Sequence, residues 1–205
     1  MSWLSKGNSA MKKQSLKSSL HGFSMVEVMI TLLVVSVALL SSVSLQVLSK
    51  RSNYDAAQRT TAAHLAEDLL ERMRNNPTAL IDYITAGNLG NGSRGGLPAT
   101  NCGDPLIECT AAELATFDMW HWEQLLDGSF EVSGGESVGG LVTPTACING
   151  PGFGGNGVYS IAIAWRGMTE LTNPVIDNCG AGSGNYGAND VNRRIMVVRT
   201  FVNAS

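Results

Sequence analysis

The side chains best suited to covalent chemistry in this sequence are its four cysteines, Cys102, Cys109, Cys147 and Cys179. In an oxidising compartment an even number of cysteines predicts disulfides, and four cysteines allow three connectivities. We favour Cys102–Cys109, because a glycine and a proline lie between them and suit a small loop. We favour Cys147–Cys179 as the second pair, because it would join the loops that flank a predicted strand at residues 157–166. A zinc site is not predicted, since the sequence has no C-x-x-C motif and His121 is the only histidine after residue 77.

Two glycine-rich segments, which begin at Gly150 and Gly182, match the G-x-G-x-x-G pattern of dinucleotide sites. Such a site requires the motif to follow a strand and open a helix, whereas both segments lead into predicted strands, so we interpret them as turns. The sequence contains no G-x-S-x-G or H-E-x-x-H motif, and its net charge of −3 does not favour binding to nucleic acid. We therefore predict a protein that is not an enzyme and has no cofactor, metal or nucleic-acid partner.

Glu27 is the one charged residue in a long apolar run at residues 23–49, which Lys50 and Arg51 close. The segment before the run contains no acidic residue and is basic, with Lys6, Lys12, Lys13 and Lys17. A membrane-spanning helix needs about 20 apolar residues, whereas the apolar core of a secretory signal has about 7–15. The run therefore predicts a membrane-inserted helix rather than a signal cleaved behind its apolar core.

An acidic side chain inside a membrane costs about 2.5–3.5 kcal/mol, so the position of Glu27 requires an explanation. In one interpretation Glu27 lies at the level of the lipid headgroups, near the start of the helix, and costs little. In the other it pairs with a cation, for which an α-amino group created by cleavage before Phe23 is the nearest candidate. That amine could belong to the same helix or to a neighbouring subunit in a staggered assembly.

The segment around this glutamate resembles the class III leader and N-terminal helix of type IV pilins and pseudopilins. It reads Gly22-Phe23-Ser24-Met25-Val26-Glu27-Val28. The resemblance implies that a prepilin peptidase cleaves after Gly22, that Phe23 becomes the N-methylated first residue, and that Glu27 is the glutamate used in assembly. Met11 as an alternative start would leave a shorter leader.

A second segment is similar to the end of the N-terminal helix in PilV-type minor pilins, the type IV pilus modification proteins. It reads Ala66-Glu67-Asp68-Leu69-Leu70-Glu71-Arg72-Met73-Arg74-Asn75-Asn76-Pro77. Asp118, Trp120 and Trp122 also resemble that pattern. The resemblance implies a minor pilin that primes assembly or caps the tip of a type IV pilus, with downstream adhesion or twitching motility. The alternative is a minor pseudopilin of a type II secretion or DNA-uptake system.

The implied partners are the prepilin peptidase, other minor and major pilins, the inner-membrane assembly platform, and the membrane itself before assembly. The implied location is the bacterial inner membrane with the head in the periplasm, and afterwards the pilus at the cell surface. A single-pass periplasmic enzyme or sensor is the remaining class, which would show a catalytic set and no cleavage at Gly22.

The elements that must position these residues begin with one long helix. Residues 54–74 contain no glycine or proline and are rich in helix formers, and Pro77 then stops the helix. An apolar stripe at helical spacing is formed by Ala62, Leu65, Ala66, Leu69 and Met73. We expect this stripe to pack on a sheet.

The remainder of the chain predicts one short helix and several strands. Thr110 and Glu113 form a capping box, which predicts a helix to about Asp127 with Gly128 after it. Its expected core-facing residues are Leu114, Phe117, Met119, Trp122, Leu125 and Leu126. Weak strands are predicted at 130–138 and 141–148, and strong ones at 157–166 and 194–202.

Together these elements predict an α+β protein with the pilin fold, in which a long N-terminal helix packs on an antiparallel sheet and one extra short helix is added. The predicted organisation is a leader at 1–22, a membrane or filament-core half-helix at 23–49, an amphipathic half-helix at 50–76 and a globular head at 77–205.

Overall fold

The computed structural model of the chain describes residues 22–85 and 88–204, apart from the side chain of Glu136. The predicted leader lies outside the described residues except for Gly22. The chain divides into two compact units, with the boundary between Gln46 and Val47. Each unit is described separately below.

Helix α1, Met25–Asn75, contributes to both units. In the first unit it is an isolated apolar helix whose described residues are all exposed. In the second unit it becomes amphipathic, and every member of the predicted stripe from Ala62 to Met73 is buried. The predicted helix and its core-facing stripe are confirmed.

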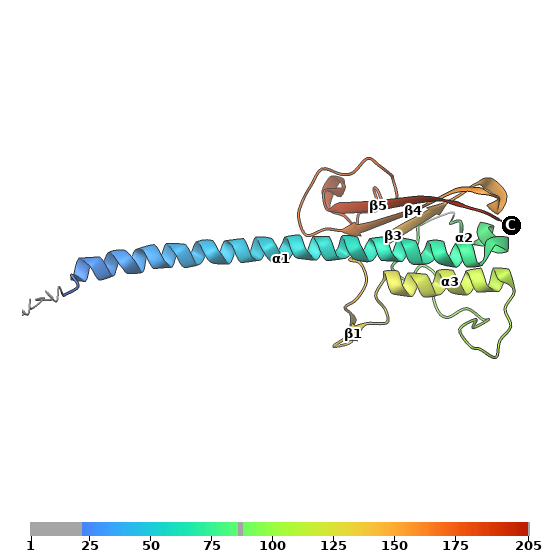
Figure 1. Ribbon diagram of the computed structural model, residues 1–205, viewed down its shortest axis with the longest axis horizontal. Helices are drawn as coiled ribbons and strands as arrows, with labels where there is room; N and C mark the ends of the chain where they lie inside the picture. Colours follow the sequence, from blue (N-terminus) through green and yellow to red (C-terminus); the bar gives the residue numbers. More distant parts are fainter. Residues whose placement is uncertain (1–21, 86–87, 205) are drawn as a thin grey trace, which may run out of the picture. The chain divides into compact units, whose positions relative to one another are not determined.

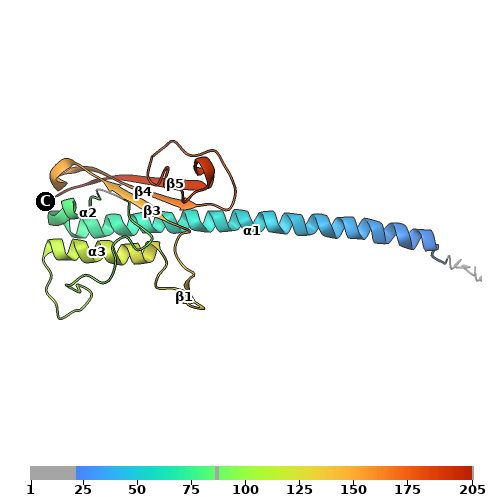
Figure 2. The same ribbon diagram turned by 180° about the vertical axis from the view of Figure 1, so that it is seen from behind.

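The second unit is built in three layers around α1. A sheet of β3 (Thr145–Asn149), β4 (Gly157–Arg166) and β5 (Arg193–Val202) covers one side of α1, and helix α3 (Ala111–Leu126) covers the other (Figures 1 and 2). The indole N–H of Trp122 in α3 donates to the carbonyl oxygen of Leu65 in α1 at 2.8 Å, which confirms the contact between the two helices.

The sheet is antiparallel with the order β3-β4-β5. On its inner face Tyr159, Ile161, Ile163 and Trp165 are buried against the core, as their alternation predicts. In β5 the inner face is formed by Met196, Val198 and Val202. The α+β fold, with a long N-terminal helix on an antiparallel sheet, is therefore confirmed.

Two strand predictions were wrong in their extent. Residues 130–138 form a small hairpin of two-residue strands, β1 (Val132–Ser133) and β2 (Glu136–Ser137), because Gly134 and Gly135 both have positive φ and turn the chain. The strand predicted at 141–148 begins only after Pro144, since proline has no N–H for the ladder.

Helix α3 begins and ends where its capping signals predict. The Thr110 hydroxyl accepts from the backbone N–H of Glu113, whose carboxylate in turn accepts from the backbone N–H of Thr110 at 2.9 Å. Gly128 follows the helix with a φ of +68°, as a C-terminal glycine should. A short 3-10 turn, Pro77–Ala79, and helix α2, Leu80–Tyr83, connect α1 to the loop before α3.

The prediction of which residues of α3 face the core was only half right. Met119, Trp122 and Leu126 are buried, whereas Leu114, Phe117 and Leu125 are half-buried. Three residues that the sequence analysis did not select are buried instead: Ala115, Asp118 and Glu123. Two of these are carboxylates, and each has a structural role described below.

The loop between β4 and β5 covers part of the outer face of the sheet. Tyr186 is buried there and donates to the hydroxyl of Thr145 at 2.8 Å. Because this loop covers them, Ala162 and Ala164 are as fully buried as the inner-face residues. Arg193, at the start of β5, is also buried and organises the loop.

Candidate functional site

The start of α1 carries the residues to which the sequence analysis assigned processing and assembly. Gly22, Phe23 and Ser24 precede the helix without regular structure and are exposed. Ser24 caps the helix, since its hydroxyl accepts from the N–H of Val26 at 3.3 Å and its carbonyl from the N–H of Val28 at 3.2 Å. Apart from its two neighbours in the sequence, no described residue lies within 4 Å of a Cβ built on Gly22. The described part of the chain therefore does not cover the bond between Gly22 and Phe23.

Glu27 lies in the first turn of α1. Its side chain makes no hydrogen bond or ion pair to any described residue and is exposed. A carboxylate at this position interacts favourably with the positive end of the helix dipole. The geometry leaves its oxygens available to an external cation.

Four hydroxyl groups in the apolar part of α1 are satisfied by the helix backbone. Thr31, Ser36, Ser41 and Ser44 each donate to a backbone carbonyl three or four residues earlier, at 2.8–3.1 Å. The most apolar window of 18 residues has a mean hydropathy of 2.5 and is entirely unburied. By length and composition the helix can cross a membrane, and its apolar surface requires lipid or other helices to cover it.

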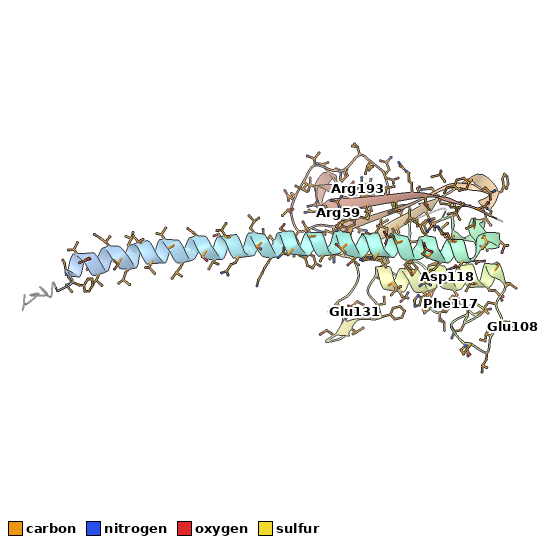
Figure 3. All side chains as sticks on the ribbon, viewed as in Figure 1. Arg59, Glu108, Phe117, Asp118, Glu131 and Arg193 are labelled. Atoms are coloured by element: carbon orange, nitrogen blue, oxygen red, sulfur yellow. A yellow bond between two sulfur atoms is a disulfide. The ribbon has the colours of Figure 1, made fainter. Side chains whose placement is uncertain are left out.

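At the other end of α1 a buried polar network fixes the helix to the head. The Arg72 guanidinium donates to Asp118 at 2.9 Å and to Asp68 at 2.8 Å. The second oxygen of Asp118 accepts from the hydroxyl of Tyr83 at 2.6 Å. Asn76 donates to the carbonyl of Ala111 at 2.8 Å and so ties the end of α1 to the start of α3. Figure 3 shows Asp118 on the side of α3 that faces α1.

These contacts shift the ionisation of the groups in the network. Burial and the Asp118 carboxylate raise the pKa of Tyr83 well above its usual range, so the phenol remains a neutral donor. Burial, and then the charge of Arg72, lower the pKa of His121. Arg72 has no acceptor, so the Nδ1 atom of His121, 3.2 Å from it, must accept from the guanidinium as part of a neutral ring.

A second carboxylate of α3 holds the glycine-rich loop before the first disulfide. Glu123 is fully buried and accepts from the backbone N–H groups of Gly90 (2.8 Å), Ser93 (2.9 Å) and Arg94 (2.7 Å). Asp127, one turn later, accepts from the N–H groups of Asn91 and Gly92 at 2.8 Å. Burial raises the pKa of Asp127, although these two hydrogen bonds oppose the shift. Hydrogen bonds to these two carboxylates, and not a helix or a sheet, hold this loop in place.

The structure joins the cysteines in the two pairs that the sequence analysis favoured. Cys102–Cys109 closes a small loop before α3, and Cys147–Cys179 joins β3 to the β4–β5 loop. Among the described residues no group of three or more His, Cys, Asp or Glu side chains is arranged to hold a metal ion. The polar clusters described above connect elements of the head to one another.

Residues 44–120 match the Tt1218-like family model, which describes the type IV pilin Tt1218. This segment is therefore similar to type IV pilins. It spans the amphipathic half of α1, helix α2, the Cys102–Cys109 loop and the part of α3 that carries Asp118. No curated protein and no solved structure matches the chain. The match concerns the type IV pilin family and does not single out its PilV-type branch.

The sequence analysis missed the network around Arg72 and the role of Glu123. It selected only apolar residues of α1 and α3 as core-facing. One signal was present: Arg72 and Asn76 are four residues apart and therefore share a helix face, next to the buried Leu69 and Met73. Neither carboxylate partner could be read from that spacing.

Proposed function

We propose that this protein is a minor pilin, of the PilV type, that takes part in the assembly, priming or tip complex of a type IV pilus. The observation that carries the proposal is the exposed apolar helix with Glu27 in its first turn, directly after the Gly22–Phe23 junction. The match of the adjoining segment to the type IV pilin family supports a pilin-like role. A protein of this kind is structural and not an enzyme.

The proposed maturation has two steps at the start of α1. A prepilin peptidase hydrolyses the peptide bond between Gly22 and Phe23, and the new α-amine of Phe23 is methylated. That amine stays positively charged, and Glu27 offers the nearest negative charge, in the same subunit or to a neighbour. The Ser24 cap lies after the cleavage point, so cleavage leaves the start of the helix intact.

The proposed assembly transfers the apolar helix from lipid to other helices. Residues 23–49 lie in the inner membrane while the head is in the periplasm, and afterwards they pack among the helices of other minor and major pilins. The assembly platform of the inner membrane would carry out the transfer. Residues 50–76 join this half-helix to the head at 77–205.

The first experiment is to determine the intact mass and the N-terminal peptide of the protein recovered from its host. The proposal expects a chain that begins at methylated Phe23. An uncut N-terminus in cells with active peptidase would reduce the protein to a membrane-anchored head and overturn the proposal. A minor pseudopilin would be processed in the same way, so the neighbouring genes distinguish a pilus from a secretion or DNA-uptake system.

A second experiment tests the assembly role of Glu27. Replacing Glu27 by Ala removes the carboxylate from the apolar run and should reduce incorporation into filaments at least tenfold, while the head keeps its fold and its disulfides. Glu67→Ala is the matched control, because Glu67 is an exposed carboxylate on the same helix. Incorporation of the Glu27 variant at the level of the control would reject the electrostatic role.

A further inference from the structure

The three-stranded sheet of the head has two edges, and one of them is paired with another segment of the chain. Strand β3 forms the first edge and β5 forms the second (Figure 1). Along an edge strand, every second residue turns its backbone N–H and C=O away from the sheet. Such groups can pair with a further strand wherever nothing else bonds to them.

The outward backbone groups of β3 are paired with the segment that precedes the Cys102–Cys109 loop. Leu89 and Ala146 exchange two backbone hydrogen bonds, of 2.8 Å and 2.9 Å. Ile148 accepts from the backbone N–H of Thr85 at 3.1 Å and donates its own N–H to the Thr85 hydroxyl at 3.1 Å. The edge formed by β3 is therefore satisfied within the head.

The outward residues of β5 follow from its register with β4. The N–H of Gly167 donates to the carbonyl oxygen of Asn192 at 2.8 Å, one step beyond the paired residues Arg166 and Arg193. Hydrogen-bonded pairs alternate along an antiparallel ladder, so the even-numbered residues of β5 bond to β4. The odd-numbered residues turn their backbone groups outward. We define the open edge as residues 197–201, in which the outward residues are Val197, Arg199 and Phe201.

The loop between β4 and β5 covers the start of β5 but not the open edge. Arg193 donates to the side chain of Asn173 at 2.9 Å, and to the carbonyl oxygens of Asp177 (2.8 Å) and Cys179 (2.7 Å). The outward N–H and C=O groups of the open edge, in contrast, bond to no residue that the structure describes. The head thus satisfies one edge of its sheet and leaves most of the other unpaired.

A groove between α1 and the open edge has room for the side chains of an added strand. Its volume is about 420 Å³, and Leu70 and Val198 contribute apolar surface to it. Its other lining residues include the charged side chains of Glu67, Glu71 and Arg74. A strand beside β5 would direct every second side chain toward this groove. Small polar side chains suit these walls better than large apolar ones.

On the outer face of the sheet, the open edge presents one basic side chain between two apolar ones. Val197, Arg199 and Phe201 lie on this face, since they alternate with the inward Val198. Phe201 is 61% exposed and pairs with Val158 of β4, which is also exposed. The guanidinium of Arg199 is exposed and makes no hydrogen bond or ion pair to any described residue. An acidic residue directly opposite Arg199, with apolar residues on either side, would complement this pattern.

We propose that the open edge binds an extended segment of a different protein chain, which adds to the sheet as an antiparallel fourth strand. The segment carries an acidic residue opposite Arg199, apolar residues opposite Val197 and Phe201, and small polar residues over the groove. A second copy of β5 does not fit, because this strand contains three arginines and no acidic residue. Antiparallel pairing is slightly more stable per residue than parallel pairing. The inference does not depend on the processing or the membrane insertion of the N-terminal helix.

The test uses the full chain in detergent and a synthetic peptide of about nine residues, the length of a long strand. Valine and threonine alternate in the peptide, and aspartate replaces the central valine. Amide exchange measured by NMR should become about tenfold slower at Val197, Arg199 and Phe201 when the peptide is bound. The amides of Val198 and Thr200 already bond to β4 and should change little. This alternation distinguishes an added strand from a peptide that only lies across the surface.

Two N-methylated peptides test the backbone pairing without any change to the protein. Methylation of the aspartate and its two nearest valines removes N–H groups that face β5, and should lower the affinity roughly tenfold or more. Methylation of three threonines, whose N–H groups face away from β5, should leave the affinity nearly unchanged. Fluorescence anisotropy of labelled peptides gives both affinities. Equal affinities for the two methylated peptides would overturn the proposal, because binding would not use the backbone.

The charge at the centre of the edge is tested by Arg199→Glu. This variant should bind the aspartate peptide about fivefold more weakly, and a peptide with lysine at the centre about fivefold more tightly. Arg94→Glu is the matched control, because it makes the same change of charge at an exposed arginine in the loop before α3. An equal response of the two variants would reject the acidic residue that we assign to the partner.

Two further results would also contradict the proposal. Unchanged exchange along the open edge at the highest soluble concentration of the aspartate peptide would show that the edge does not accept a strand. Alternating protection that appears without peptide, and rises with protein concentration, would assign the edge to a second copy of this chain and overturn the choice of partner.

Discussion

The two carboxylate oxygens of Asp118 accept hydrogen bonds from two different elements of the head. One accepts from Arg72 of α1 and the other from Tyr83 of α2, while Asp118 itself belongs to α3. The carboxylate is largely buried, and so is the phenol of Tyr83, which has no other acceptor. A single side chain therefore connects three helices.

Replacing Asp118 by Ala should lower the free energy of unfolding by roughly 3 kcal/mol, because it leaves the buried phenol of Tyr83 without an acceptor and removes one of the two carboxylates that bind the half-buried guanidinium of Arg72. Chemical denaturation of the protein in detergent measures this loss. Asp68→Ala is the control, since Asp68 binds the same arginine but its side chain is 41% exposed, and it should cost less than about 1 kcal/mol. Equal losses for the two variants would contradict the importance of burial.

His121 makes the stability of the head depend on pH. Its pKa is lowered in the folded state by burial and by Arg72, whereas the unfolded imidazole titrates near about 6.5. Below that value the unfolded chain binds more protons than the folded one, so acid favours unfolding. The contribution is complete above the unfolded pKa and is lost as the pH falls toward the folded pKa.

We expect His121→Gln to remove this part of the pH dependence as the pH falls below about 6.5, because an amide can accept from Arg72 but does not titrate. The slope of the unfolding free energy against pH is the measurement. His64→Gln, at an exposed histidine of α1, should keep the wild-type slope. A slope that persists in the His121 variant would assign the acid sensitivity to other groups.

At the scale of elements, α3 supports a loop that has no regular structure of its own. Residues 90–94 donate backbone N–H groups to Glu123 and Asp127, and Gly90, Asn91 and Gly92 all have positive φ. These conformations leave the N–H groups pointing to one side, where two carboxylates one turn apart can accept them. The loop is thus held by side chains of the helix and not by a backbone ladder of its own.

Glu123→Gln should loosen this loop, because the new amide NH₂ can face the N–H of Arg94 as a second donor. Hydrogen exchange of residues 90–94 should become at least tenfold faster, with α3 itself unaffected. Glu131→Gln, at an exposed carboxylate, is the control. Unchanged exchange in the Glu123 variant would mean that other contacts hold the loop.

The elements also show which features of the fold can be predicted from sequence. Helix α1, the capping box of α3 and strand β4 follow local rules of spacing, capping and alternation, and all were predicted. The hairpin at Gly134 and Gly135 was missed, although two adjacent glycines are a turn signal. The partners of Arg72 and Glu123 could not be predicted, because contacts such as Arg72–Asp118, 46 residues apart, depend on how the helices pack.

At the scale of the whole molecule, the two disulfides close loops of different length. Cys102 and Cys109 are 7 residues apart, and Cys147 and Cys179 are 32 apart. In the chain-entropy model the longer loop restricts the unfolded chain more, which gives about 2.5 kcal/mol for the short loop and about 3.7 kcal/mol for the long one. The second disulfide also anchors the segment that Arg193 binds.

Replacing Cys147 and Cys179 together by Ala should therefore destabilise the head by about 1 kcal/mol more than replacing Cys102 and Cys109. Denaturation midpoints of the two double variants under non-reducing conditions give the comparison. The long-loop variant should also lose exchange protection in residues 173–179. A larger loss for the short loop would indicate that strain or residual structure, and not loop length, decides the effect.

The central place of α1 in the head has a mechanical consequence. Neither disulfide includes a residue of α1, so only non-covalent contacts hold the sheet and α3 against it. A pull along α1 against the head loads these contacts in shear, and the apolar stripe, Gln58, Arg72 and Trp122 must resist it together. The covalent connection through Asn76 and Pro77 takes the load only after that shear contact has failed. The strength of the subunit under tension therefore depends on the packing of residues 58–73, which neither disulfide crosslinks.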